Sequence, residues 1–208
     1  MFVKICGITN LEDALAAVAA GADMLGFNFY RSSSRYIEPR AAREIIDEFA
    51  WTDLLTVGVF VNEKTPQRVE QVADEAGVCA LQLHGDESPD YCRALKRQHV
   101  IKVLRVTRDF VPERALDYKV ESIMLDAFDK DLRGGTGQTI DWSIARRTRE
   151  LVPKLFLAGG LSPENVAAAI AAVEPYAVDT CSAVETTPGK KDAQRMREFV
   201  IAAKAPRT

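Results

Sequence analysis

A cysteine and an aspartate stand at the ends of two strand-like segments, where either could transfer a proton. Cys6 closes the apolar segment 2–6, and Asp126 lies near the end of the segment 123–127. An ordinary thiol titrates near ~8.5 and an ordinary aspartic acid near ~3.9, so both need tuning before they can work as base and acid. Each also fits a structural role, Cys6 as a small buried hydrophobe and Asp126 as a helix or loop cap.

Strand alternation places Lys4 on the same face of the first segment as Cys6, because successive side chains point to opposite faces. Val3 and Ile5 take the other face, which we expect to pack against helices. Lys4 would lie about 6.6 Å from Cys6 along the strand, where its positive charge favours the thiolate. An ion pair inside the fold is the alternative role for Lys4.

The elements that would carry these residues alternate along the whole chain. The sequence predicts a helix after most strands, with Thr9 or Asn10 capping the first, Thr65 and Pro66 starting the one after 55–61, and Asp192 beginning the last. Ser162 is expected to cap the helix that begins at Pro163. The segment 108–117 is predicted to be irregular or weakly helical. The predicted strands cover residues 2–6, 24–29, 55–61, 78–83, 100–106, 123–127, 154–158 and 177–181.

Eight such units predict an α/β fold, a (β/α)₈ TIM barrel that forms one catalytic domain over 1–208. An open doubly wound sheet is the runner-up, but the GxGxxG motif expected after its first strand is absent. The active site of a barrel lies at the C-terminal ends of the strands. The first and sixth strands are three positions apart in the ring. Cys6 and Asp126 should therefore face each other across its mouth, as a proton-transferring isomerase requires.

Other polar residues gather at the same strand ends, in the predicted loops or just before them. We expect them to contact a substrate, although Arg35 by itself also fits a solvated loop charge. These predicted binding residues are Lys4, Arg35, Gln82, His84 and Asp179.

A phosphate site is predicted in the loops after the seventh and eighth strands. Gly159 and Gly160 expose backbone N–H groups before the helix that Ser162 is expected to cap, and such loops often bind phosphate in barrels. Ser182 and Ala183 would complete the site. A tight turn without any ligand is the alternative reading of the two glycines.

Composition argues against several other classes of protein. The 208 residues are 47% hydrophobic and 27% charged, with a net charge of -3 and no basic run, so a nucleic-acid partner is not predicted. No apolar run reaches the roughly 20 residues that cross a bilayer, and no signal region precedes the first strand.

The scattered cysteines predict a cytoplasmic protein with reduced thiols, and two histidines are too few for most zinc sites. The glycine-rich segment 134–137 lacks the Lys-Ser/Thr of a nucleotide P-loop, so ATP binding is not predicted. The oligomeric state stays open, with a homodimer among the alternatives.

Seven short motifs follow one another over essentially the whole chain, most of them at predicted strand ends. They are Lys-Ile-Cys-Gly-Ile-Thr at 4–9, Gly-Val-Phe-Val-Asn at 58–62, Gln-Leu-His-Gly-Asp-Glu at 82–87, Leu-Asp-Ala at 125–127, Gly-Gly-Thr-Gly at 134–137, Ala-Gly-Gly-Leu at 158–161 and Pro-Gly-Lys-Lys-Asp at 188–192. Together they closely resemble the phosphoribosylanthranilate isomerase family of tryptophan biosynthesis.

The resemblance implies an Amadori rearrangement of N-(5-phosphoribosyl)anthranilate to 1-(2-carboxyphenylamino)-1-deoxyribulose 5-phosphate, with no cofactor or metal. Cys6 matches the position of the family's general base, and Asp126 matches that of its general acid. Arg35 matches the arginine that meets the anthranilate carboxylate. The phosphate-binding positions are matched by Gly159, Gly160, Ser182 and Ala183.

The sequence departs from the family pattern at two places. Ala183 replaces a usual glycine beside the phosphate, which would strain only a turn with positive φ. Serines at 32–34 replace a frequent proline in the loop before Arg35, which puts the rigidity of that loop in doubt.

Two other functions compete with the isomerase. The neighbouring lyase of the pathway, indole-3-glycerol-phosphate synthase, would require catalytic lysines, a glutamate and an extra N-terminal segment, whereas this chain starts directly at its first predicted strand. A non-catalytic phosphosugar-binding barrel is the third hypothesis, and the presence of Cys6 and Asp126 opposes it.

Overall fold

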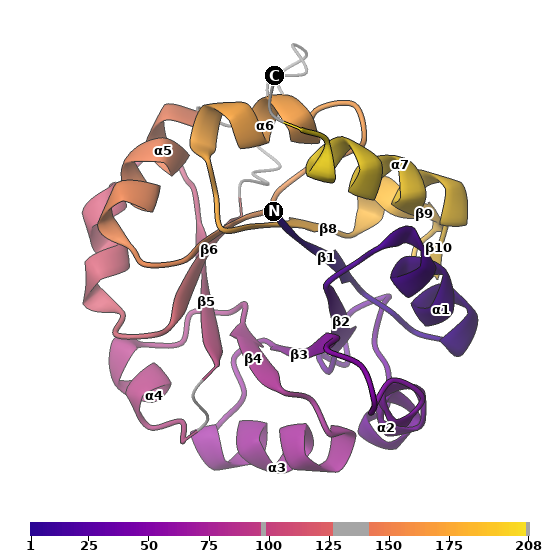
Figure 1. Ribbon diagram of the computed structural model, residues 1–208. Coiled ribbons are helices and arrows are strands. Elements are labelled where there is room, and N and C mark those ends of the chain that lie inside the picture. Colours follow the sequence, from indigo (N-terminus) through magenta and orange to yellow (C-terminus); the bar gives the residue numbers. More distant parts are fainter. Residues whose placement is uncertain (97–98, 127–141, 207–208) are drawn as a thin grey trace.

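Eight parallel strands close into a barrel, in which each strand pairs with the next and β8 pairs with β1 (Figure 1). The computed structural model describes residues 1–96, 99–126 and 142–206. The barrel strands are β1 Phe2–Cys6, β2 Met24–Asn28, β3 Leu55–Phe60, β4 Ala80–Leu83, β5 Val100–Arg105, β6 Ser122–Asp126, β7 Leu155–Leu157 and β8 Ala177–Thr180. The predicted (β/α)₈ fold is confirmed, and the open doubly wound sheet is wrong.

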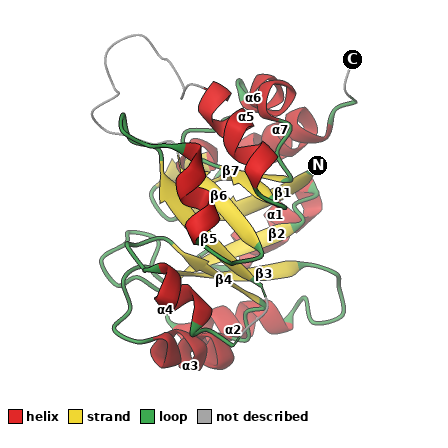
Figure 2. Cartoon of the chain, turned by 90° about the vertical axis from the view of Figure 1, so that its left-hand side faces the viewer, coloured by secondary structure: helices red, strands yellow, loops and turns green. Residues whose placement is uncertain are grey.

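Helices surround the barrel and cover the outer face of its strands (Figures 1 and 2). They are α1 Leu11–Ala20, α2 Pro39–Asp47, α3 Pro66–Ala76, α4 Pro89–Arg93, α5 Trp142–Leu151, α6 Val166–Val173 and α7 Ala193–Lys204, with the 3₁₀ turns η1 Pro112–Asp117 and η3 Ser182–Val184. After η3 comes a small antiparallel hairpin, β9 Glu185–Thr187 and β10 Lys190–Lys191. Among the described residues, no helix has the length and apolar character that crossing a membrane requires.

Capping residues explain where several helices begin. The side chains of Asn10, Thr65 and Asp192 accept hydrogen bonds from backbone N–H groups in the first turns of α1, α3 and α7. Pro66 supplies the first residue of α3, where its missing N–H costs no helical hydrogen bond. These starts agree with the sequence predictions.

The start of α6 contradicts its prediction. Residues 163–165 form a turn, the helix begins at Val166, and Ser162 does not cap it. The Ser162 amide instead donates to Asn165 Oδ1 (2.8 Å), while Asn165 Nδ2 donates to the carbonyl of Gly160 (3.0 Å). Asparagine side chains compete with the helix backbone for hydrogen bonds, and here the competition delays the helix by one turn.

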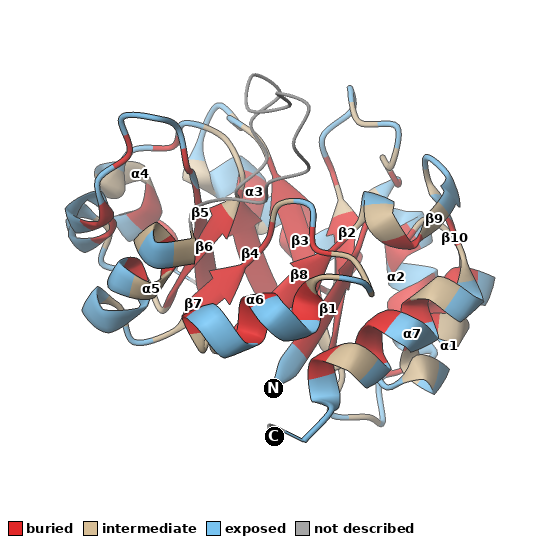
Figure 3. Cartoon of the chain, turned by 90° about the horizontal axis from the view of Figure 1, so that it is seen from above, coloured by how far each residue is buried: buried red, intermediate tan, exposed pale blue. Residues whose placement is uncertain are grey.

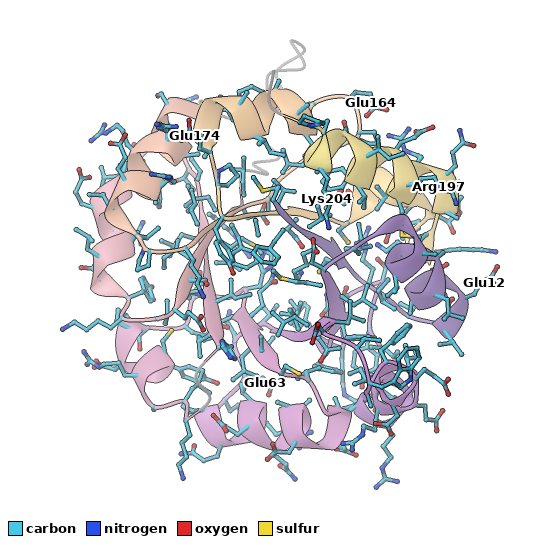
Figure 4. The ribbon with its side chains drawn as sticks, in the orientation of Figure 1. Glu12, Glu63, Glu164, Glu174, Arg197 and Lys204 are labelled. Atoms are coloured by element: carbon cyan, nitrogen blue, oxygen red, sulfur yellow. The ribbon has the colours of Figure 1, made fainter. Side chains whose placement is uncertain are left out.

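Two apolar layers cover the two faces of the barrel. Val3 and Ile5 lie fully buried in the outer layer, between strands and helices, as their alternation predicts. Figure 3 shows buried strands between helices whose outer faces are exposed, and Figure 4 shows side chains filling the ring that the helices form. Charged side chains such as Glu12 on α1 and Arg197 on α7 lie at its rim (Figure 4). The inner layer is made of Met24, Val57, Ala80, Ile101, Val103, Met124, Phe156, Ala158 and Ala177.

Candidate active site

An open cavity of about 320 Å³ lies at the C-terminal ends of the barrel strands. Cys6 from β1 and Asp126 from β6 both line it, so the two predicted proton-transfer residues face the same space. Of the predicted site residues, only Lys4 is not part of the lining. The others that line it are Arg35, Gln82, His84, Gly159, Gly160, Asp179, Ser182 and Ala183.

Lys4 lies beneath the cavity floor in an ion pair with Asp179. Its side chain is fully buried, and its Nζ donates to Asp179 Oδ1 at 2.8 Å. Burial lowers the pKa of Lys4, but Asp179 and Cys6 outweigh burial and raise it overall, so Lys4 remains an ammonium group. Burial also raises the pKa of Asp179 to about 6, against the opposing effect of Lys4. Lys4 is therefore a fixed positive charge below the cavity, and the ion pair considered as its alternative role is present.

The Cys6 thiol lies in a position that favours its thiolate. A hydrogen bond from Cys181 lowers its pKa most, and the charges of Lys4 and Lys191 add to this, so the pKa falls well below its usual value despite burial. Gly26 leaves the space for this arrangement, since a Cβ there would lie 2.8 Å from Cys6 Sγ and 2.9 Å from Lys4 Nζ. The surroundings of Cys6 thus favour its thiolate over its thiol.

Asp126, across the cavity from Cys6, contacts a histidine. Gln82 Nε2 lies 3.1 Å from His84 Nδ1, and His84 Nε2 lies 3.0 Å from Asp126 Oδ2. With the amide donating to Nδ1, the ring proton is on Nε2 and is donated to the carboxylate. Among the described residues, Gln82 Oε1 is a buried oxygen with no hydrogen-bond partner.

A buried ion pair fixes the loop that carries His84. Lys102 Nζ donates to Glu87 Oε2 (2.7 Å) and to the carbonyl of Gly85 (2.7 Å), and both charged side chains are almost fully buried. Glu87 also accepts from the backbone N–H groups of Gly85 and Asn62. This pair joins the loops after β3 and β4 and so holds His84 near Asp126.

Arg35 reaches the cavity from the loop after β2, held by a partner that sequence reasoning missed. Its Nε and Nη2 donate to the two carboxylate oxygens of Glu185, at 2.9 and 2.6 Å. These hydrogen bonds raise the pKa of Arg35, which remains charged. Lys191 Nζ also donates to Glu185 (2.9 Å), so one carboxylate holds two cations beside the site. The remaining donor, Nη1 of Arg35, has a contact of 3.5 Å with Ser34 Oγ.

The predicted phosphate loops lie together at the rim of the same cavity. Gly159 and Gly160 have φ values of 83° and 73°, which favour glycine. Ser182 and Ala183 form the turn η3, and Ala183 is not among the described non-glycine residues with positive φ. The alanine therefore causes no backbone strain. The glycine-rich segment 134–137 lies outside the described residues.

Sequence reasoning did not assign roles to several residues around the cavity. Glu87 and Lys191 belong to the motifs at 82–87 and 188–192, so the sequence indicates that they lie near the site. It does not indicate which residues they pair with. Cys181 could have been found by pairing the first and eighth strands, because both then present a cysteine at the same level. Glu185 lies near one motif but gave no separate signal.

The fold and the cavity define an acid–base TIM-barrel enzyme, in which a thiol of lowered pKa and a histidine-linked carboxylate face one pocket. The sequence model of the family described as N-(5'phosphoribosyl)anthranilate (PRA) isomerase matches residues 3–202. The chain belongs to this family.

Individual relatives support the same membership. The N-(5'-phosphoribosyl)anthranilate isomerase of Trichlorobacter lovleyi is 48% identical over 202 residues, covering 97% of each chain. The crystal structure of the enzyme from Thermotoga maritima has a TM-score of 0.91 at 46% identity and covers 99% of this chain and 100% of that chain. A structure of phosphoribosyl anthranilate isomerase in complex with reduced 1-(o-carboxyphenylamino)-1-deoxyribulose 5-phosphate has a TM-score of 0.88 at 44% identity. It covers 99% of this chain and 100% of that chain. The predicted family is confirmed.

Proposed function

We propose that this chain converts N-(5-phosphoribosyl)anthranilate to 1-(2-carboxyphenylamino)-1-deoxyribulose 5-phosphate, as a step of tryptophan biosynthesis. The observation that carries the proposal is that Cys6 and Asp126 line one cavity in environments suited to a base and an acid. The complex of a related enzyme with a reduced form of this product supports the choice of substrate.

The chemistry begins at Asp126, which protonates the furanose ring oxygen and opens the ring to a Schiff base. The Cys6 thiolate then takes the proton from C2, and the resulting enol tautomerises to the ketone. Lys4 stabilises the thiolate before this step without touching the substrate, because it lies under the cavity floor.

The Gln82–His84 pair lets Asp126 hold or release its proton. When Asp126 is ionised, His84 Nε2 donates to it, and the Gln82 amide nitrogen donates to Nδ1. When Asp126 is protonated, Nε2 accepts the acid proton, and a turned Gln82 amide offers its free oxygen to Nδ1–H. His84 and Gln82 thus serve mainly to position the acid.

The other lining residues orient the two ends of the substrate. The backbone N–H groups around Gly159, Gly160 and Ser182 would bind the phosphate, and Arg35 would meet the anthranilate carboxylate with the Nη1 group that Glu185 leaves available. The reacting carbons would then lie between Cys6 and Asp126.

Direct turnover of freshly prepared phosphoribosylanthranilate by the purified chain tests the proposal. Loss of anthranilate-type fluorescence with formation of the ribulose product is the expected result. Formation of indole-3-glycerol phosphate from that product would support the lyase instead. Binding of the substrate without turnover would support the non-catalytic barrel.

Replacing Lys4 by methionine is expected to move the acidic limb of kcat/KM to higher pH. The active form is the thiolate, and the charge of Lys4 lowers the pKa of Cys6, so removing that charge raises the pKa and removes thiolate at low pH. The variant should also carry Asp179→Asn, which avoids leaving a buried carboxylate without its partner. Lys204→Met, which removes a surface ammonium paired with Asp23, is the control. An unshifted limb in the double variant would refute the assigned role of Lys4.

Replacing Ala183 by glycine is expected to lower KM or leave it unchanged. The alanine backbone is not strained, but its methyl group lines the cavity beside the proposed phosphate loop, and glycine would open access to the backbone there. Steady-state kinetics with the natural substrate measure this. A KM raised about tenfold, or ~1.4 kcal/mol of lost binding, would contradict the placement of the phosphate.

We also propose that the chain forms a homodimer through the N-terminal end of the barrel. A related enzyme from Thermotoga maritima, 43% identical, is described as dimeric. Trp51, in the turn before β3, is 85% exposed. A second cavity is lined by Leu55, the first residue of β3, and by Phe156 and Tyr176. Sedimentation equilibrium should give twice the chain mass of 23.0 kDa, and Trp51→Glu should give the monomer. A monomeric unaltered chain at micromolar concentration would disprove this.

A further inference from the structure

Two cysteines meet at the mouth of the barrel, one from each of two adjacent strands. β1 and β8 pair in parallel register, with Lys4 opposite Asp179 and Ile5 opposite Thr180. The next residue on each side is Cys6 and Cys181, and both line the cavity. Paired strands lie about 4.8 Å apart, which falls within the ~4.4–6.8 Å between Cα atoms that a disulfide needs.

The two side chains also point the same way. Lys4 and Asp179, one pair earlier in register, meet at 2.8 Å inside the barrel, and alternation returns the chain to that face at Cys6 and Cys181. The two side chains are neighbours at the cavity, and each shifts the pKa of the other. Gly7 keeps this contact open, because a Cβ at its φ of 78° would lie 3.1 Å from Cys181 Sγ.

We propose that Cys6 and Cys181 form a redox modification site, in which a hydroperoxide oxidises Cys6 and Cys181 then closes a reversible disulfide. Cys181 is half-buried at the rim of the open cavity, so a small peroxide reaches both sulfurs by the route open to a substrate. The disulfide removes the thiolate that the proposed isomerase uses as its base.

The two steps balance without a further reactant. The Cys6 thiolate attacks one peroxide oxygen, forming an S–O bond while the O–O bond breaks and alkoxide or hydroxide leaves. Cys181 sulfur then attacks the sulfenic sulfur, the S–O bond breaks, and the departing hydroxide takes the Cys181 proton to form water. Two thiols are oxidised to one disulfide, and the peroxide is reduced to an alcohol, or to water, plus one water.

The surrounding charges assign different roles to the two thiols. Lys4 and Lys191 stabilise the Cys6 thiolate, which makes Cys6 the attacking sulfur. The hydrogen bond to Cys6, followed by burial, raises the pKa of Cys181 well above its usual value, so Cys181 remains a thiol until the second step. Lys191 Nζ lies 3.8 Å from Cys181 Sγ, where it assists the loss of that proton.

The other two cysteines provide internal controls. Cys79 is exposed and contacts Thr56 Oγ1, and Cys92 is buried in α4, where burial raises its pKa to about 11. Neither lines the cavity. Oxidation of Cys79 would reflect exposure alone, whereas oxidation of the Cys6–Cys181 pair requires the contact described above.

Titration of the reduced protein with hydrogen peroxide tests the site. After catalase treatment, free thiols are alkylated under denaturing conditions, and the digest is analysed by mass spectrometry without reduction. The expected product is a peptide pair joined through Cys6 and Cys181, formed in parallel with loss of activity and reversed by dithiothreitol. The linked peptide is independent of the proposed function, whereas the loss of activity rests on it.

Two variants make the outcome decisive. Cys181→Ser should form no disulfide, and peroxide should convert its Cys6 to sulfinic acid, with activity that dithiothreitol no longer restores. Cys79→Ser should oxidise and recover as the unaltered chain does. Sulfinic acid at Cys6 in the unaltered chain, a disulfide to another cysteine, or no oxidation of Cys6 would each overturn the proposal. A linked peptide in a protein without turnover would refute the isomerase function alone.

Discussion

Replacing Cys6 by alanine is expected to lower kcat by about 10²–10⁴-fold, the range that one general base contributes. KM should change little, because the side chain meets the reacting carbon and not the phosphate or the anthranilate ring. The thermal midpoint should also change little, since the thiol is small and borders an open cavity. Steady-state kinetics and a melting curve measure the three quantities on one preparation.

Cys92→Ala is the matched control for this variant. Cys92 is also a buried cysteine, but its raised pKa keeps it a thiol and it lies away from the cavity. The Cys92→Ala substitution should leave a small cavity, which lowers the free energy of unfolding slightly, and should not change kcat. Near-normal turnover by Cys6→Ala would show that another group takes the C2 proton, and the base would then have to be sought elsewhere in the lining.

The alternation of strands and helices made the barrel predictable from sequence. Each short β-branched run and each capped helix is a local signal, and their order leaves few ways to close a parallel sheet. Asn10 and Thr65 behaved as their sequence context indicates. Ser162 did not, because the side chain of Asn165, three residues later, turned back to the loop and made the turn more favourable than a helix start.

The site was predictable to the extent that it depends on strand ends. Alternation and ring position bring Cys6 and Asp126 to one cavity without any knowledge of the loops. The pairing of Arg35 with Glu185 depends on how two loops fold, which no spacing in the sequence specifies. The Glu87–Lys102 pair could not be predicted either, because charged residues are normally expected at the surface and this pair is buried.

The two sides of the cavity differ in charge, and this difference suits the proposed reaction. Around Cys6 lie the ammonium groups of Lys4 and Lys191, which hold a proton acceptor in its ionised form. Around Asp126 lie His84 and Gln82, a hydrogen-bonded pair that positions the carboxyl group. One barrel therefore gives its proposed base and its proposed acid two different electrostatic surroundings.

Replacing Asp126 by asparagine is expected to lower kcat by about 10²–10⁴-fold, because the amide keeps the shape and the hydrogen bond to His84 but cannot deliver a proton. The loss should fall on ring opening, so the C2 proton step should still proceed when an already opened aldimine is supplied. Asp86→Asn, an exposed carboxylate on the neighbouring loop that does not line the cavity, is the matched control and should keep its rate. Normal turnover of the ring-closed substrate by Asp126→Asn would show that Asp126 is not the ring-opening acid. An equal loss of rate with the ring-closed substrate and with the opened aldimine would show the same. His84 would then be the next group to test.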